Sequence, residues 1–223
     1  MTGLKTFCLI PAYNEEKTIA AVINQVKPLV AQVVVIDDGS TDNTFQLAKA
    51  QDITVLHHII NRGQGAALQT GAEYALNQGA QIIVHFDADG QFLASEIKEI
   101  VSPIAGGNFD VVFGSRFLEK KSHIPWFKKN VILPLARIIN KLFLGVILTD
   151  PQSGFRALSR KVAEEIKIEQ SRMAHCSEIS AKVLASNFKV KEVPITVIYH
   201  GFGQRFSEGI KILKELIIAR LIN

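Results

Sequence analysis

Short runs of aliphatic residues recur along the first half of the chain, separated by stretches with a helical pattern. The clearest runs lie at 33–36 (VVVI), 82–86 (IIVHF) and 110–114 (DVVFG), and further candidate strands lie at 4–10 and 53–57. Runs without polar alternation are typical of strands buried on both faces of a parallel sheet. The pattern predicts an α/β fold: a doubly wound, Rossmann-like, mostly parallel sheet with helices on both faces.

The intervening segments predict the helices, and the second half of the chain is less regular. In the first half, helices are expected at 15–30, from Thr41 or Asp42 to residue 50, at 65–77 and at 95–105. In the second half we expect amphipathic helices within 124–148 and at 208–222, a polar return at 150–158, helices at 161–168 and 176–186, and an edge strand at 189–198. No linker or repeat interrupts the chain, which predicts one domain spanning residues 1–223.

Composition excludes several classes of protein. With 223 residues, 48% of them hydrophobic, the chain can bury a sizeable core, which excludes a disordered tail. A net charge of +4 is too mild to indicate nucleic-acid binding by itself. Arg137 and Lys141 interrupt the longest apolar stretch and exclude a transmembrane span, and no signal peptide is visible, so a cytoplasmic protein is expected. Cys8 and Cys176 lack metal-ligand spacing and read as small buried hydrophobic residues.

Acidic residues follow two of the buried strands at the point where each strand ends. Asp37 and Asp38 follow the run at 33–36, and Asp87-Ala88-Asp89-Gly90-Gln91 follows the run at 82–86. In an extended chain, residues two apart point to the same side, so Asp87 and Asp89 can aim at one point. Mg²⁺ and Mn²⁺ prefer such hard oxygen ligands together with substrate phosphates. These ends predict a metal–diphosphate site, and the alternative is a pair of acidic turns.

A glycine-containing segment, Asn61-Arg62-Gly63-Gln64-Gly65, opens the helix expected at 65–77. Glycine-rich helix starts suit phosphate groups. Close packing of the helix on the sheet explains the glycines equally well, and both interpretations stay open.

Taken together, these motifs resemble those of the family 2 glycosyltransferases, which have a GT-A fold, and in particular the branch similar to dolichyl-phosphate mannose synthase. The matching segments occur in the family's order and span nearly the whole chain. They are 11–15 (PAYNE), 37–42 (DDGSTD), 61–65 (NRGQG), 87–91 (DADGQ), 114–116 (GSR), 150–156 (DPQSGFR) and 192–195 (EVPI).

The resemblance implies an inverting hexosyltransferase, with residues 1–115 binding the nucleotide sugar and residues 116–223 binding the acceptor. By likeness, the donor contacts are Pro11, Tyr13, Glu15, Asp37, Asp38, Ser40, Gly65, Asp87, Ala88 and Asp89. A Mg²⁺ or Mn²⁺ ion would be held by Asp87, Asp89 and Gln91. The metal would act as a Lewis acid on the leaving nucleoside diphosphate.

Two acceptors are consistent with the second half of the chain. A polyprenyl phosphate brings its own charged oxygen nucleophile, which Arg116, Ser153, Arg156 and Arg205 would bind, with Asp89 also at the reacting centre. A sugar hydroxyl of an envelope polysaccharide or glycolipid requires a general base, for which Asp150 is the candidate. A third possibility is a nucleotide-sugar-binding protein without turnover.

A basic and apolar segment after Arg116 points to a membrane surface. Lys120, Lys121, Lys128 and Lys129 surround Trp126 and precede the aliphatic stretch. This pattern is typical of helices lying in a bilayer interface, so peripheral attachment at the cytoplasmic face is expected. Packing against a second copy or a membrane subunit is the alternative. The stretch 199–209 departs from the family pattern, with His200 in place of an arginine.

Overall fold

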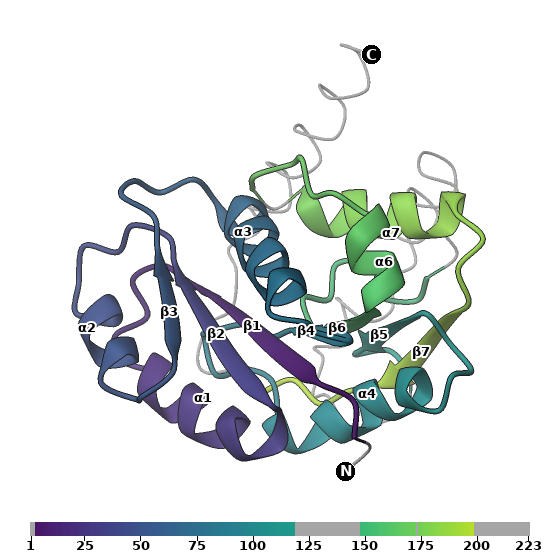
Figure 1. Ribbon diagram of the computed structural model, residues 1–223, viewed down its shortest axis with the longest axis horizontal. Coiled ribbons are helices and arrows are strands. Elements are labelled where there is room, and N and C mark those ends of the chain that lie inside the picture. Colours follow the sequence, from purple (N-terminus) through teal and green to yellow (C-terminus); the bar gives the residue numbers. More distant parts are fainter. Residues whose placement is uncertain (1–2, 119–147, 173, 199–223) are drawn as a thin grey trace, which may run out of the picture.

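The computed structural model describes residues 3–118, 148–172 and 174–198, which form a mixed sheet covered by helices on both faces (Figure 1). The sheet is seven-stranded in the order β3-β2-β1-β4-β6-β5-β7. The strands are β1 (Thr6–Ala12), β2 (Gln32–Asp37), β3 (Thr54–His57), β4 (Ile82–His85), β5 (Val111–Ser115), β6 (Arg156–Ser159) and β7 (Val190–Pro194). The helices are α1 (Ile19–Val26), α2 (Thr44–Lys49), α3 (Gln64–Asn77), α4 (Ile97–Ala105), α6 (Arg160–Glu165) and α7 (His175–Ala185).

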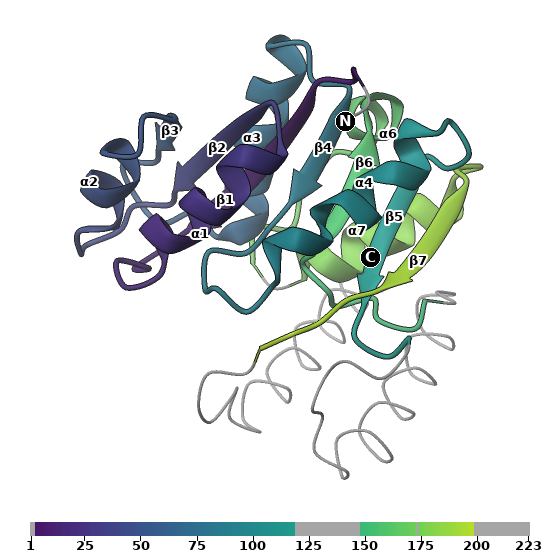
Figure 2. The ribbon, with the colours of Figure 1, turned by 90° about the horizontal axis from the view of Figure 1, so that it is seen from below.

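The strands predicted in the first half pair in parallel. β1 lies between β2 and β4, and β2 in turn pairs with β3. β7 pairs in parallel with β5 at the edge of the sheet, as Pro194 predicts, and Figure 2 shows it opposite β3. The mostly parallel, doubly wound sheet is thereby confirmed.

The second half holds one strand that the sequence reading missed. The polar return expected at 150–158 ends in β6, which runs antiparallel between β4 and β5. Its four residues, RALS, are too short and too mixed to show a strand pattern. The insertion places the start of β6 beside the carboxyl ends of β4 and β5, because His85 and Phe113 both pair with Arg156.

Alternation along β1 divides the core between the two faces of the sheet. Phe7 and Leu9 pack with the α3 side chains, whereas Cys8 and Ile10 pack with those of α1 and α4. A third cluster joins β5 and β6 to α6 and α7. Figure 1 shows α1 and α4 on one face and α3, α6 and α7 on the other. Cys8 is fully buried in the apolar core, as expected.

Glycine allows α3 to approach the sheet closely. A Cβ at Gly71 would lie 2.7 Å from the Cδ1 atom of Ile36, so a side chain there would push the helix outward. Ala67 and Ala75 on the same helix are completely buried. Small residues therefore set the spacing between α3 and the strands.

The first helix begins later than its sequence pattern predicts. α1 starts at Ile19 rather than at residue 15. The preceding residues bind the loop after β2 instead: the Asn14 backbone N–H donates to Ser40 Oγ, and the Glu15 N–H donates to Thr44 Oγ1 at 2.7 Å. Asn14 has a left-handed φ of 57°, which a continuous helix would not allow.

None of the helices in the described residues is long and apolar enough to cross a membrane. The predicted amphipathic helices lie outside the described ranges, apart from Leu148, and so does Arg205. The expected extent of one domain over residues 1–223 includes these segments and stays a prediction.

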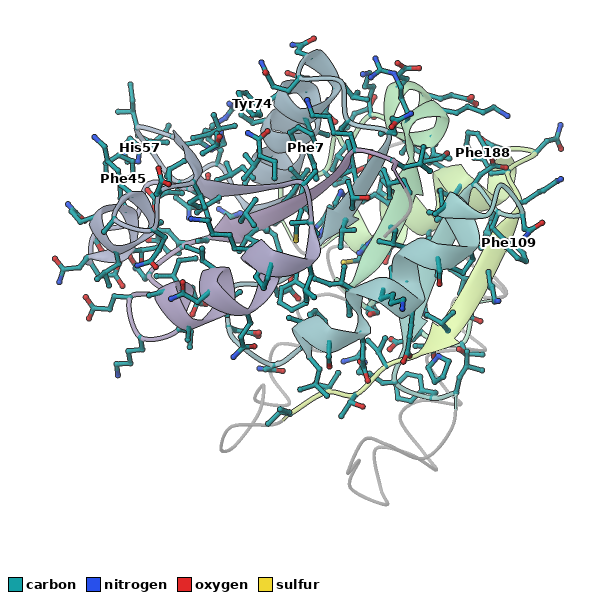
Figure 3. All side chains as sticks on the ribbon, turned by 60° about the horizontal axis from the view of Figure 1, so that its bottom comes forward. Phe7, Phe45, His57, Tyr74, Phe109 and Phe188 are labelled. Carbon is teal, nitrogen blue, oxygen red and sulfur yellow. The ribbon has the colours of Figure 1, made fainter. Side chains whose placement is uncertain are left out.

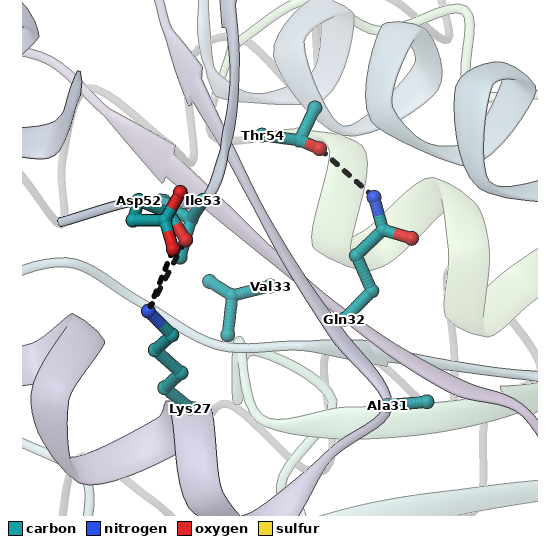
Figure 4. A pocket seen from close by; sticks show the side chains of 7 residues that line it. All are labelled: Lys27, Ala31, Gln32, Val33, Asp52, Ile53 and Thr54. Atoms are coloured by element: carbon teal, nitrogen blue, oxygen red, sulfur yellow. Dashed lines mark hydrogen bonds and ion pairs between the residues drawn. The ribbon is translucent and has the colours of Figure 1, made fainter.

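A shallow hollow lies at the amino-terminal ends of β2 and β3 (Figure 4). The Lys27 side chain reaches the backbone oxygen of Asp52 at 3.1 Å on one side of it, and Gln32 donates to Thr54 on the other. Ligands of doubly wound sheets bind at the opposite, carboxyl ends of the strands, so this hollow is not the candidate site.

Candidate active site

The carboxyl ends of β1, β2, β4 and β5 bring the predicted site residues to one edge of the sheet. Parallel pairing sets Ala12 beside Asp37, and Leu9 beside His85 just before Asp87. The order of the strands reverses between β1 and β4, and such a switch point is where ligands of these sheets bind. Because β6 runs in the opposite direction, the segment 150–156 enters at the same edge.

At the end of β2, each of the two aspartates lies within hydrogen-bonding distance of a histidine. His57 Nδ1 lies 2.8 Å from Asp37 Oδ2, and His58 Nδ1 lies 2.7 Å from Asp38 Oδ1. The parallel register of β2 with β3 sets Asp37 directly beside His57, which explains the pairing. His57 also packs on Phe45, with ring centroids 4.7 Å apart, as Figure 3 shows.

Asp38 fixes the loop that connects β3 to α3. Besides His58, it accepts the backbone N–H groups of Arg62 at 2.9 Å and Gly63 at 2.6 Å. His58 is itself held on its other side by Thr70 Oγ1 at 3.0 Å. Asp38 is buried, and both of its oxygens accept hydrogen bonds from its own chain. It therefore stabilises the loop beside the predicted donor site.

The remaining predicted donor residues lie around the ends of β1 and β2. Pro11 is buried in β1, whereas Tyr13 is 47% exposed beyond its end. Ser40 accepts the Asn14 N–H and donates its own N–H to Asp37. Burial raises the pKa of Glu15, and the nearby carboxylate of Asp89 raises it further. Glu15 therefore lies within electrostatic reach of the second acidic strand end.

The glycines after β3 serve packing in this structure. A side chain at Gly63 would collide with the carbonyl of Ser171, and one at Gly65 with the carbonyl of Gln170. The Gly65 N–H donates to Ser171 O at 2.9 Å, so it is not presented to a ligand. Close packing therefore accounts for these glycines, and a donor contact at Gly65 stays a prediction.

Asp87 and Asp89 follow β4, and Asp87 accepts fewer hydrogen bonds than Asp38 does. Asp87 accepts one hydrogen bond, from Gln64 Nε2 at 2.8 Å, and no ion pair within the described part of the chain involves it. Burial raises the pKa of Asp87 to about 6, and Asp89 adds to the shift. His175, Arg156 and Gln64 offset only part of it. This carboxylate carries a negative charge that its own chain leaves poorly compensated.

The loop before β6 leaves room for these carboxylates. A Cβ at Gly154 would lie 2.5 Å from Asp87 Oδ2, so only glycine fits against that group. Asp89 Oδ1 accepts the Gln91 N–H at 3.0 Å, a local hydrogen bond within the motif at 87–91. Ala88, between the two aspartates, is buried in the core.

The donor set fits a divalent cation that a substrate helps to hold. No trio of His, Cys, Asp or Glu side chains in residues 3–118, 148–172 and 174–198 is arranged to bind a metal alone. Mg²⁺ usually takes one or two protein carboxylates and completes its shell with water and substrate phosphates. Asp87 and Asp89 supply that number of carboxylates.

Arg116 and Asp150 form a two-pronged ion pair at the end of β5. Arg116 Nε lies 2.6 Å from Asp150 Oδ2, and its Nη2 lies 2.7 Å from Oδ1. The Arg116 backbone N–H also donates to Oδ2, at 3.1 Å. Asp150 is buried, and Arg116 engages both of its carboxylate oxygens.

Arg156, which is expected to bind the acceptor phosphate, is completely buried at the start of β6. Its Nη2 donates to Ser153 O at 2.8 Å and to Cys176 Sγ at 2.9 Å. Arg156 Nη1 and Ser153 Oγ have no hydrogen-bond partner among the residues that the structure describes. Arg156 and Ser153 therefore lie beside the site, and each has one buried polar atom without a hydrogen-bond partner in the described part of the chain.

Cys176 differs from its sequence interpretation. Burial alone would raise the pKa of the Cys176 thiol, but Arg156 and His175 overcome that effect and lower the pKa to about 7. Cys176 is therefore a polar partner of Arg156 rather than an inert hydrophobic residue. His175 begins α7, is buried, and lies 2.8 Å from Arg172 O through Nδ1.

Sequence reasoning missed the histidines beside the aspartates. His57 is the last residue of β3 and lies opposite Asp37, the last residue of β2. His58 and Asp38 are the next residue of each chain segment, so the parallel register was the signal that could have paired them. No spacing within the sequence signals the contact of Arg156 with Cys176, because it depends on how α7 packs on β6.

Comparison with known proteins agrees with this geometry. The family model of glycosyl transferase family 2 matches residues 7–167. A UDP-N-acetylglucosamine–dolichyl-phosphate N-acetylglucosaminyltransferase of Methanococcus voltae is 33% identical, with 96% of this chain and 96% of that protein aligned. A polyprenol monophosphomannose synthase of Mycolicibacterium smegmatis is 29% identical over 95% of this chain and 84% of its own length.

Solved structures show the same architecture. Glucosyl-3-phosphoglycerate synthase of Mycobacterium tuberculosis, crystallised with Mn²⁺, UDP and phosphoglyceric acid, superposes with a TM-score of 0.76. The match covers 96% of this chain and 76% of that one at 21% identity, which is a likeness of fold and confirms the predicted GT-A architecture. The sheet, the ordered motifs and these matches lead to one conclusion: this chain is a member of glycosyl transferase family 2.

Proposed function

We propose that this glycosyltransferase moves a hexose from a nucleotide sugar to the phosphate of a polyprenyl phosphate. The observation that carries the choice of acceptor is the ion pair of Asp150 with Arg116, which occupies both oxygens of the candidate base. A phosphate acceptor needs no base, because its oxygen is already negatively charged. The named activities of the Methanococcus and Mycolicibacterium relatives support the same acceptor class.

On the donor side, Mg²⁺ or Mn²⁺ would be held by Asp87 and Asp89, with Gln91 next to them. The charge of Asp87, which its own chain compensates only in part, supports this assignment. When bound, the cation would supply Lewis acidity to the leaving diphosphate. Asp37, Tyr13 and Glu15 would border the nucleoside at the neighbouring strand ends.

The reaction we propose is a single displacement that inverts the anomeric centre. An oxygen of the acceptor phosphate forms a bond to the anomeric carbon while the bond to the diphosphate oxygen breaks. The electron pair of that bond leaves with the nucleoside diphosphate. The contribution of this chain is to align the two substrates and to compensate their charge, with Arg116 facing the acceptor phosphate.

Access to a lipid acceptor requires that the site face a membrane. We propose peripheral attachment at the cytoplasmic face through the basic and aromatic segment that begins at Lys120. A second copy or a membrane subunit could provide the same attachment, and sedimentation with vesicles in the absence of other proteins separates these routes.

The test is a transfer assay followed by extraction into organic solvent. Purified protein is incubated with Mn²⁺, labelled UDP- and GDP-sugars in turn, and polyprenyl phosphate in detergent. We expect label in the organic phase, loss of that label in Asp89→Asn, and retention of it in the matched surface variant Asp52→Asn.

The other outcomes identify other functions. Label transferred only to polysaccharide or glycolipid hydroxyl groups would move the assignment to hydroxyl transfer. Tight donor binding without turnover on either acceptor would indicate a nucleotide-sugar-binding protein and would contradict the proposal.

A further inference from the structure

We propose that Glu192, on the edge strand β7, is a positioning residue that holds the Arg116–Asp150 pair in its working geometry. The inference rests on the proposed function, because it assumes that Arg116 faces the acceptor phosphate. Glu192 lies in the EVPI motif at 192–195, and no residue of this motif is assigned to the donor site or to the metal site.

One oxygen of Glu192 holds the turn that presents Asp150. Glu192 Oε1 accepts the Thr149 backbone N–H at 2.8 Å, the Thr149 hydroxyl at 2.7 Å and the Asp150 N–H at 3.3 Å. Asp150 in turn holds Arg116 through both of its oxygens. Glu192 thus contacts the backbone of the residue that orients the arginine.

The hydroxyl groups around Thr149 form a directed chain that ends on Glu192. Thr149 donates its hydroxyl proton to Glu192, so Ser115 must donate in its 2.6 Å contact with Thr149 Oγ1. Ser115 Oγ accepts the Phe117 N–H at 3.2 Å. Hydrogen bonds in such chains polarise one another, and an anionic terminal acceptor strengthens them.

This network joins segments that are distant in the sequence. Ser115 and Arg116 end β5, Thr149 and Asp150 precede β6, and Glu192 lies at the centre of β7, opposite Phe113. The β5–β7 pairing is backbone to backbone and does not need a carboxylate at position 192. The Glu192 side chain instead accepts hydrogen bonds from Thr149 and Asp150, and it thereby holds this turn against β7.

A carboxylate is specifically suited to this turn. It can accept three donors at one oxygen, whereas a neutral hydroxyl or an apolar side chain would leave buried N–H groups without acceptors. A displacement of about 1 Å in a substrate-orienting group can reduce turnover about a hundredfold. Loosening the turn should therefore affect use of the acceptor and spare donor binding, which depends on the other strand ends.

The test compares four proteins in the organic-phase assay, with acceptor kinetics and calorimetric donor binding measured separately. For Glu192→Ala we expect kcat/KM for polyprenyl phosphate to fall about 10- to 100-fold, with the dissociation constant of the nucleotide sugar within about twofold of wild type. Glu192→Gln keeps an acceptor oxygen and should retain activity within about fivefold. Glu165→Ala, an exposed glutamate on α6, is the control and should match wild type.

Thr149→Val keeps the test decisive if Glu192→Ala does not fold. It removes the hydroxyl that donates to Glu192 and accepts from Ser115, and it keeps the two backbone donors to Glu192. It should lower kcat/KM for the acceptor by about threefold to tenfold, again without a change in donor binding. Unchanged acceptor kinetics in a folded Glu192→Ala or Thr149→Val would overturn the inference. Equal losses in donor and acceptor binding would also overturn it, since they would indicate a general structural role.

The wild-type measurement separates this inference from the function on which it rests. If the wild-type protein transfers no label to lipid, the proposed function fails and the positioning role falls with it. If the wild type is active and the variants keep its acceptor kinetics, the function stands and only the role of Glu192 is wrong.

Discussion

Two strands in this protein, β2 and β4, are each followed by a pair of aspartates, but the surroundings of the two pairs differ. At the end of β2, Asp37 and Asp38 pair with His57 and His58, and backbone N–H groups complete the shell of Asp38. At the end of β4, Asp87 has one amide donor and a raised pKa.

The difference shows what distinguishes a structural aspartate from a candidate metal ligand. A carboxylate whose oxygens accept hydrogen bonds from its own chain stabilises the loops that it binds. A buried carboxylate whose charge is offset only in part destabilises the metal-free fold, and a bound cation would compensate it. The second strand end is therefore the better candidate for the metal–diphosphate site.

The largest effect should come from removing the charge at the second strand end. Asp89→Asn should lower transfer at least about a thousandfold, because stabilisation of the leaving diphosphate by the metal is worth several kcal/mol. Initial rates at saturating donor measure this. A loss below about tenfold would mean that the pair does not bind the catalytic cation.

Removing the charge of Asp38, at the end of β2, should destabilise the fold. Asp38→Asn places an amide N–H₂ group against the donors from His58 and the loop backbone, which should cost about 2–4 kcal/mol. Chemical denaturation of the metal-free protein measures the loss. Asp52→Asn, at an exposed site, should change the free energy of unfolding by less than about 0.5 kcal/mol.

The same substitution at Asp87 should have the opposite sign. Asp87→Asn keeps the oxygen that accepts from Gln64 and removes a charge that the chain compensates only in part, so the metal-free protein should gain about 1–2 kcal/mol at neutral pH. The figure is reduced from the full pKa shift because Asp87 retains some contact with solvent. A loss of stability in this variant would contradict the contrast between the two ends.

The pH dependence follows from the direction of that shift. The folded pKa of Asp87 is about 6, above its ordinary value of 3.8, so between these values the folded protein holds a proton that the unfolded chain has lost. The penalty from Asp87 therefore grows as pH rises from about 4 to 6 and is complete above that window. The advantage of Asp87→Asn should vanish below about pH 4, and Mn²⁺ affinity should fall about tenfold per pH unit below 6.

The smallest effect is expected at His57, and it should distinguish this histidine from His58. His58 is buried between Asp38 and Thr70, so His58→Ala should cost about 2–3 kcal/mol. His57 is partly exposed on Asp37, and His57→Ala should cost about 1 kcal/mol or less. Equal losses in thermal unfolding would mean that burial does not distinguish the two pairs.

Much of this contrast could be predicted from sequence, because it depends on local patterns. Buried runs gave the parallel strands, and the end of each run placed the aspartates at one edge. The register of β2 and β3 pairs each aspartate with a histidine, but the sequence reading did not use that register.

The rest depended on tertiary packing. The short β6 carries no strand pattern of its own, so its insertion between β4 and β5 could not be foreseen. The pairing of Asp150 with Arg116 bridges 34 positions, and the contact of Arg156 with Cys176 bridges 20. Each contact changes the chemistry that the sequence alone assigns to the residue.

The most direct test of the contrast is the thermal stability of three proteins with and without Mn²⁺ plus UDP or GDP. The wild type and Asp38→Asn should both gain several degrees when the correct nucleotide and Mn²⁺ are added. Asp87→Asn should begin with a higher Tm than the wild type and gain almost nothing. A full gain in Asp87→Asn, or its loss in a folded Asp38→Asn, would show that the cation binds elsewhere and would contradict the account.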